Sequence, residues 1–158
     1  EAYTARRLSE EISRTNDTGV PFLFAVMKVS TGRRRRGRRP DDDDNNNNDD
    51  NTDDNNDDVE PPSPSDLPRI ERAVARTRRE HDHLGRLDSI RPGTVAAILP
   101  GLGDEEADHL EQQWTAITSE TVKRRYGNDA RVSVESCCYG SGEFTGDPEA
   151  QNIFAELL

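Results

Sequence analysis

A low-complexity segment at residues 31–65 divides this sequence of 158 residues into two parts. It opens with an arginine-rich run and continues as an Asp/Asn-rich tract at 41–58. In total it holds six Arg, ten Asp, one Glu and a single aliphatic residue, Val59. Blocks of like charge repel one another, and Asp, Asn and Pro resist regular structure. The segment therefore predicts a disordered insertion, so that a fold has to be built from residues 1–30 and 66–158.

The remainder of the chain is long enough for one modest core. Outside the insertion, 123 residues (158 minus 35) carry a net charge of −6, because the whole chain has −11 and the insertion has −5. A body of this size can bury a single core. No apolar run approaches the roughly 20 residues of a membrane span. The net negative charge disfavours a nucleic-acid-binding protein, because carboxylates and phosphates repel each other.

The cysteines and histidines indicate neither a disulfide nor a metal site. Cys137 and Cys138 are adjacent. Neighbouring strand residues point to opposite faces of a sheet, so a bond between these two would be strained. Without a disulfide framework or a secretory signal, the sequence favours a reducing, cytoplasmic location. The three histidines lack the spacing of zinc ligands, and we expect no metal and no cofactor.

Hydrophobic periodicity outside the insertion predicts alternating helices and strands. Helices are expected over 3–15, over 66–80 and from Asp104 to about residue 125, strands over 20–29, 83–88, 94–99 and 131–139, and a short helix at 148–158 within a C-terminal tail that starts at 141. Without the first helix the order is βαββαβ. This order predicts an α/β protein of the α+β sandwich type, in which helices cover a largely antiparallel, ferredoxin-like sheet.

Four stretches of the sequence carry a family likeness through their order and spacing. They are EAYTARRLSEEISRTNDTGVPFLFAVMKVS, DLPRIERAVARTRREHDHLGRL, AAILPGLGDEEADHLEQQW and RVSVESCCYG. Together they resemble the GGDEF domains, the family of the diguanylate cyclases. The resemblance implies the nucleotide-cyclase form of the ferredoxin-like core, with an extra N-terminal helix. It assigns residues 1–30 and 66–140 to one such domain.

The same resemblance implies that the parts needed for catalysis are missing. Active members hold two divalent metals with acidic residues, and the metals activate a ribose hydroxyl against an α-phosphate. At the end of the first strand, this sequence has Lys28 and Ser30 where acids are expected. Where the Gly-Gly-(Asp/Glu)-Glu-Phe hairpin should stand, it has DSIRPGTV at 88–95. The chain thus resembles a degenerate member, and the predicted function is an inactive signalling or regulatory scaffold rather than an enzyme.

One family motif is kept. Arg79 and Asp82 form an Arg-x-x-Asp sequence before the expected hairpin. The resemblance implies an inhibitory site for cyclic di-GMP, with Arg78 and Arg86 as helpers for its phosphates. An arginine can donate two parallel hydrogen bonds to guanine or phosphate, and an aspartate can accept hydrogen bonds from the guanine edge. In the alternative interpretation, which we prefer, Arg79 and Asp82 only pair with each other at a helix end. A scaffold and a cyclic di-GMP receptor therefore both stay open.

The Arg-x-x-Asp motif and the Leu-Pro turn at 99–100 also carry a second resemblance, which concerns the cellular setting of the chain. They resemble GGDEF-like domains found beside bacterial sugar transferases that begin exopolysaccharide synthesis. This resemblance implies an attached or partner enzyme of that kind. A homodimer is a further expectation for such a module.

Overall fold

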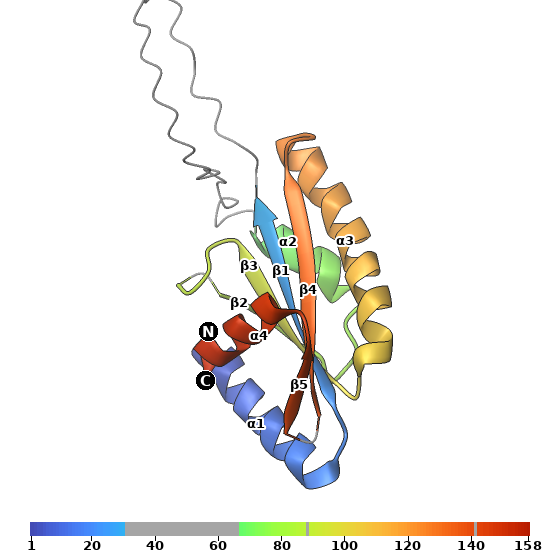
Figure 1. Cartoon of the computed structure of the whole chain (residues 1–158). Coiled ribbons are helices and arrows are strands. Elements are labelled where there is room, and N and C mark those ends of the chain that lie inside the picture. The colour runs from blue at the N-terminus through green and yellow to red at the C-terminus, as the bar shows by residue number, and fades with distance from the viewer. Residues whose placement is uncertain (31–66, 88, 141) are drawn as a thin grey trace, which may run out of the picture.

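The computed structural model describes residues 1–30, 67–87, 89–140 and 142–158, and the predicted disordered insertion lies outside them. The helices are α1 (Ala2–Thr18), α2 (Leu67–Ala75), α3 (Asp104–Tyr126) and α4 (Pro148–Leu157), and the strands are β1 (Phe22–Ser30), β2 (His83–Arg86), β3 (Thr94–Pro100), β4 (Arg131–Gly140) and β5 (Glu143–Gly146) (Figure 1). None of the described helices has both the length and the apolar character that crossing a membrane requires.

The strands form one antiparallel sheet in the order β2-β3-β1-β4-β5. The central strand, β1, pairs Phe22 with Pro100 of β3 on one side and with Tyr139 of β4 on the other. The first four strands have the arrangement of a ferredoxin-like βαββαβ core, and α1 precedes it. The predicted α+β fold with an extra N-terminal helix is confirmed.

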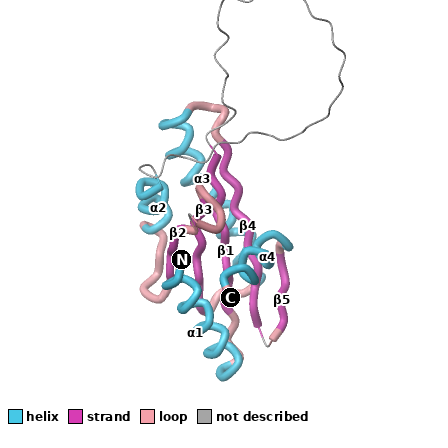
Figure 2. Tube along the Cα trace, turned by 90° about the vertical axis from the view of Figure 1, so that its left-hand side faces the viewer, coloured by secondary structure: helices cyan, strands magenta, loops and turns pink. Residues whose placement is uncertain are grey.

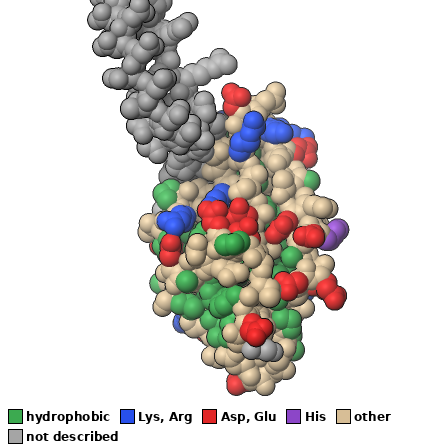
Figure 3. Space-filling model, in the orientation of Figure 1, with side chains coloured by type: hydrophobic (Ala, Val, Ile, Leu, Met, Phe, Trp, Pro, Cys, Tyr) green, Lys and Arg blue, Asp and Glu red, His purple; other side chains and the backbone are tan. Residues whose placement is uncertain are grey.

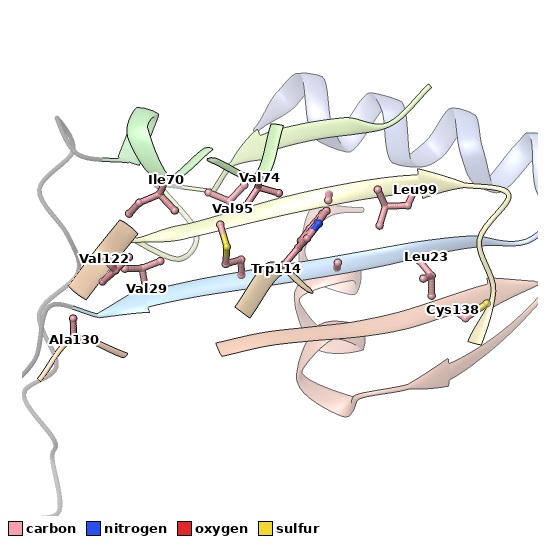
Figure 4. Packing of buried hydrophobic residues seen from close by; sticks show 13 residues of the cluster. Leu23, Val29, Ile70, Val74, Val95, Leu99, Trp114, Val122, Ala130 and Cys138 are labelled. Carbon is pink, nitrogen blue, oxygen red and sulfur yellow. The ribbon is translucent and has the colours of Figure 1, made fainter. Parts of the chain in front are cut away.

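Helices cover both faces of this sheet (Figure 2). Successive strand residues point to opposite faces. On β1, Leu23 and Met27 therefore belong to the cluster under α2 and α3, whereas Phe24 and Val26 belong to the cluster under α1 and α4. Figure 4 shows the first cluster, with side chains from both helices packed on the sheet. Burial on both faces explains why the sequence of β1 is almost continuously apolar.

The adjacent cysteines lie on opposite faces of β4, as predicted. Cys137 belongs to the cluster under α1 and α4, and Cys138 to the cluster under α2 and α3. Both are buried and free of any disulfide. Burial raises the pKa of the Cys137 thiol to about 12. Because the thiolate is the reactive form, Cys137 is inert near neutral pH.

The helix predicted to reach residue 80 is shorter, because α2 ends at Ala75. The hydroxyl of Thr77 donates to the carbonyl of Val74 at 2.7 Å. The same hydroxyl accepts from the indole Nε1 of Trp114 in α3 at 3.1 Å. A threonine that bonds back to the main chain competes with helix formation, and the indole holds it in that position.

The residues expected to form a C-terminal tail contribute a strand and a helix. The strand β5 was not predicted, and its four residues are all exposed. The helix α4 confirms the predicted one. The side chain of Asp147 accepts from the main-chain N–H groups of Glu149 and Ala150, which begins the helix. Ile153 and Phe154 are each 1% exposed, so α4 completes the core on its face of the sheet.

Candidate functional site

The end of β1 opens onto a hollow of about 860 Å³. Its walls come from β1, the β2–β3 turn, the start of β4 and α4, and they include Lys28, Ser30, Arg91, Thr94, Arg131 and Glu149. We call this region the β1 edge. Both residues that the sequence analysis singled out at the end of the first strand line it. Arg91 and Arg131 were not singled out, because only the fold brings them beside β1.

The charged side chains of the β1 edge are mainly basic. Lys28 forms an ion pair with Glu149 of α4. Arg91 Nη2 lies 2.7 Å from a carboxylate oxygen of Glu156. Arg131 Nη1 donates at 2.9 Å to a main-chain carbonyl three residues before it. Among the described residues, three cations and one carboxylate thus line the hollow.

This arrangement is suited to anions rather than to divalent metals. Magnesium and calcium take oxygen ligands, mostly carboxylates, whereas an ammonium or guanidinium group donates hydrogen bonds and repels a metal cation. Within the described part of the chain, no group of three or more His, Cys, Asp or Glu residues is placed to hold a metal ion. Glu149, the carboxylate among the described residues that line the β1 edge, already pairs with Lys28.

Glu135 of β4 is a further charged group near this edge, and the sequence analysis did not predict its environment. Its Oε2 is buried and has no hydrogen-bond partner among the described residues. Burial raises the pKa of this carboxyl, as does the charge of Asp147, whereas Lys28 lowers it. The only sequence signal is a charged residue within a predicted strand, and the fold places it opposite Val26 of the central strand.

The Arg-x-x-Asp motif lies in the turn between α2 and β2. Asp82 accepts at 2.9 Å from the main-chain N–H of Arg79 and at 2.8 Å from its Nη2. The same Nη2 donates at 2.8 Å to the carbonyl of Pro100 at the end of β3. Hydrogen bonding to Asp82 raises the pKa of Arg79. The side chain of Asp82 is 4% exposed and that of Arg79 is 48% exposed, so the pair fixes the turn while its guanidinium faces solvent.

A hollow of about 530 Å³ adjoins this guanidinium, and we call it the Arg79 hollow. Its charged lining residues are Arg7, Glu11 and Arg14 of α1 together with Arg79 and Glu80. Arg14 Nε lies 2.7 Å from a carboxylate oxygen of Glu11, whereas its Nη2 is buried without a partner among the described residues. Among the described residues, three arginines and two carboxylates leave this hollow slightly basic.

The two predicted helper residues do not line the Arg79 hollow. Arg86 lies at the far end of β2, with its Nε 3.8 Å from a carboxylate oxygen of Glu71. Arg78 is next to the motif in sequence, and its charge acts on His83, whose pKa is lowered first by burial and then by Arg7 and Arg78. The structure therefore brings Arg79 and Asp82 together and adds arginines from α1. The seven-residue spacing of those arginines on the opening helix was the only signal for them in the sequence.

Comparison with known proteins supports the fold. No protein-family model and no curated protein sequence matches the chain. Among solved structures, the chain is similar to the diguanylate cyclase SiaD of Pseudomonas aeruginosa, solved in complex with its activator SiaC, with a TM-score of 0.53 and 18% sequence identity. The match covers 98% of this chain and 53% of that chain, so this chain spans about half the length of the solved one. At that identity the likeness shows the fold alone, and the chain has a GGDEF-like fold.

Proposed function

We propose that this chain is a catalytically inactive GGDEF-like module, which serves as an interaction scaffold and regulates an attached or partner enzyme. The main support is the chemistry of the β1 edge. Lys28 and Ser30 stand where the family resemblance calls for metal-binding acids, and Lys28 lies in an ion pair with Glu149. Arg91 and Arg131 add positive charge to the same hollow.

Two-metal catalysis needs carboxylates that hold the metals and place them against the phosphates. In the proposed module the Lys28 ammonium occupies the β1 edge instead, and it provides charge without a coordination site. A GGDEF-like fold without that site still offers a rigid surface for partners. SiaD was solved in complex with an activator protein, and this supports a protein partner for a chain of similar fold.

The cellular setting that we propose rests on the sequence. Likeness to domains found beside bacterial sugar transferases favours an enzyme of exopolysaccharide synthesis as the regulated partner. The free, buried cysteines agree with the proposed cytoplasmic location.

The second candidate function is a cyclic di-GMP receptor, with the Arg79 hollow as its site. The observation that favours it is the gathering of Arg7, Arg14 and Arg79 around one hollow. Guanidinium groups bind phosphates and stack on guanine. In this function Asp82 would hold Arg79 in position, because its carboxylate is already bonded to Arg79 and is almost fully buried.

Calorimetric titration with cyclic di-GMP distinguishes the two functions. The scaffold proposal predicts no saturable heat from the folded wild-type protein. Saturable binding that Arg79→Ala abolishes, and that Arg76→Ala retains, would contradict it and establish the receptor. Arg76 is the matched control, because it is exposed in the same connection and does not line the hollow. Circular dichroism of each variant confirms that it is folded.

A further inference from the structure

A third hollow, of about 410 Å³, lies between α2 and α3 at the end where α3 finishes. We call it the interhelix hollow. Its apolar lining includes Ile70 of α2 and Val122 of α3, which are only 2% and 1% exposed. Figure 4 shows these two side chains at the same end of the core. Of its described lining residues, none also lines the β1 edge or the Arg79 hollow.

The polar lining of the interhelix hollow is basic. Arg69, Arg124 and Arg125 line it together with Tyr126, and none of the described lining residues is acidic. Arg124 forms an ion pair with Glu120 at 2.6 Å, but the two side chains are 79% and 65% exposed. An ion pair that exposed is worth little. The described lining residues therefore give this hollow a positive formal charge, on a chain whose net charge is −11.

Helix dipoles explain only part of this arrangement. Arg124 and Arg125 lie in the last turn of α3, where a cation is favourable. Arg69 adds a third guanidinium group from the neighbouring helix, α2. An anion bound between the two helices would offset the repulsion among these like charges.

We propose that the interhelix hollow binds a small organic phosphate. Arg69 and Arg124 would hold the phosphate, because a guanidinium group can donate two parallel hydrogen bonds to its oxygens. The apolar or aromatic body of the ligand would lie on Ile70 and Val122, beside the ring of Tyr126. The volume of the hollow is in the range of small-molecule sites. This proposal does not depend on the scaffold or receptor function, because it uses other residues.

Phenyl phosphate is the probe for this site, since it combines one ring with one phosphate. Titration followed by ¹⁵N amide NMR should shift the signals of Ile70, Val122 and Tyr126 and reach saturation. Inorganic phosphate tests the charge without the ring, and phenol tests the ring without the charge. We expect phenyl phosphate to bind about tenfold more tightly than either of them. Equal affinity for phenyl phosphate and inorganic phosphate would overturn the proposal.

Charge-neutral variants locate the site. Arg69→Gln and Arg124→Gln should each weaken phenyl phosphate about tenfold, as the loss of a charge-assisted hydrogen-bond pair does. Arg72→Gln is the matched control, because Arg72 is exposed on α2 and does not line the hollow. Binding that neither Arg69→Gln nor Arg124→Gln weakens, or that Arg72→Gln weakens as much, would overturn the proposal. Co-sedimentation with phosphatidylglycerol vesicles, if lost in Arg69→Gln, would instead assign the site to a lipid phosphate.

Discussion

Asp82 is the residue on which the turn between α2 and β2 depends. Its carboxylate is 4% exposed and accepts from both the main chain and the guanidinium of Arg79. Because truncation would remove the buried acceptor of several charge-assisted hydrogen bonds, we expect Asp82→Ala to lower the free energy of unfolding by about 2 kcal/mol. Urea denaturation measures the change. Asp17→Ala, at an exposed position of α1, should cost less than about 0.5 kcal/mol, and equal costs would contradict this role of Asp82.

His83 makes stability depend on pH through its contact with α1. Its Nε2 lies 3.1 Å from Thr4 Oγ1, and its ring meets Tyr3 edge-on. Burial, followed by the charges of Arg7 and Arg78, lowers the pKa of His83. The folded protein thus favours the neutral ring, while the unfolded chain takes up a proton near pH 6.5.

The contribution of His83 is therefore complete above about pH 6.5 and is lost as the pH falls below that value. We expect the melting temperature to drop between about pH 7.5 and about pH 5.5, and to drop less in His83→Gln. Parallel pH profiles for the wild type and the variant would show that His83 contributes nothing to this dependence.

At the scale of elements, α4 is part of the core. Phe154 is 1% exposed, and its ring meets Phe22, Phe24, Tyr139 and Phe144. We expect Phe154→Ala to cost about 3–5 kcal/mol of unfolding free energy, because it leaves a cavity in this cluster. Chemical denaturation compares it with Asn152→Ala, at an exposed position of the same helix. Similar costs for the two variants would contradict the packing of α4.

The elements that could be predicted are those whose signal is local. The apolar run of β1 and the helical spacing of α3 follow from residues near in sequence. The end of α2 depends instead on Thr77, which meets Trp114 in a distant helix. The strand β5 is exposed and exists through its pairing with β4, where Phe144 lies opposite Tyr139. A strand whose residues are all exposed has no alternation of buried and exposed positions from which it could be predicted.

The same distinction applies to the candidate sites. Arg79 and Asp82 are three residues apart, so their pairing could be predicted from the sequence. The β1 edge needs Arg91 and Arg131 to be brought beside Lys28, and the fold alone does this. Identifying Lys28 itself relied on the family resemblance, because nothing local marks it as a site residue.

At the scale of the whole molecule, charge is separated along the long axis of α3. This helix begins with three acidic residues, Asp104, Glu105 and Glu106, and ends with three basic ones, Lys123, Arg124 and Arg125. Figure 3 shows Lys and Arg side chains gathered toward the end of the molecule where α3 finishes. β1 ends on the same side (Figure 1). For the described residues we therefore expect ligands with negative charge to favour this end, although the chain as a whole is acidic.

An assay of GTP turnover tests most directly whether the chain lacks diguanylate cyclase activity. The full chain is incubated with GTP and Mg²⁺ or Mn²⁺, and the products are separated by anion-exchange chromatography. We expect GTP to be recovered unchanged, because the described residues of the β1 edge present Lys28, Arg91 and Arg131 to the phosphates and no pair of metal-binding acids. Cyclic di-GMP that forms in proportion to the protein, and that changes in amount in Lys28→Met, would contradict it.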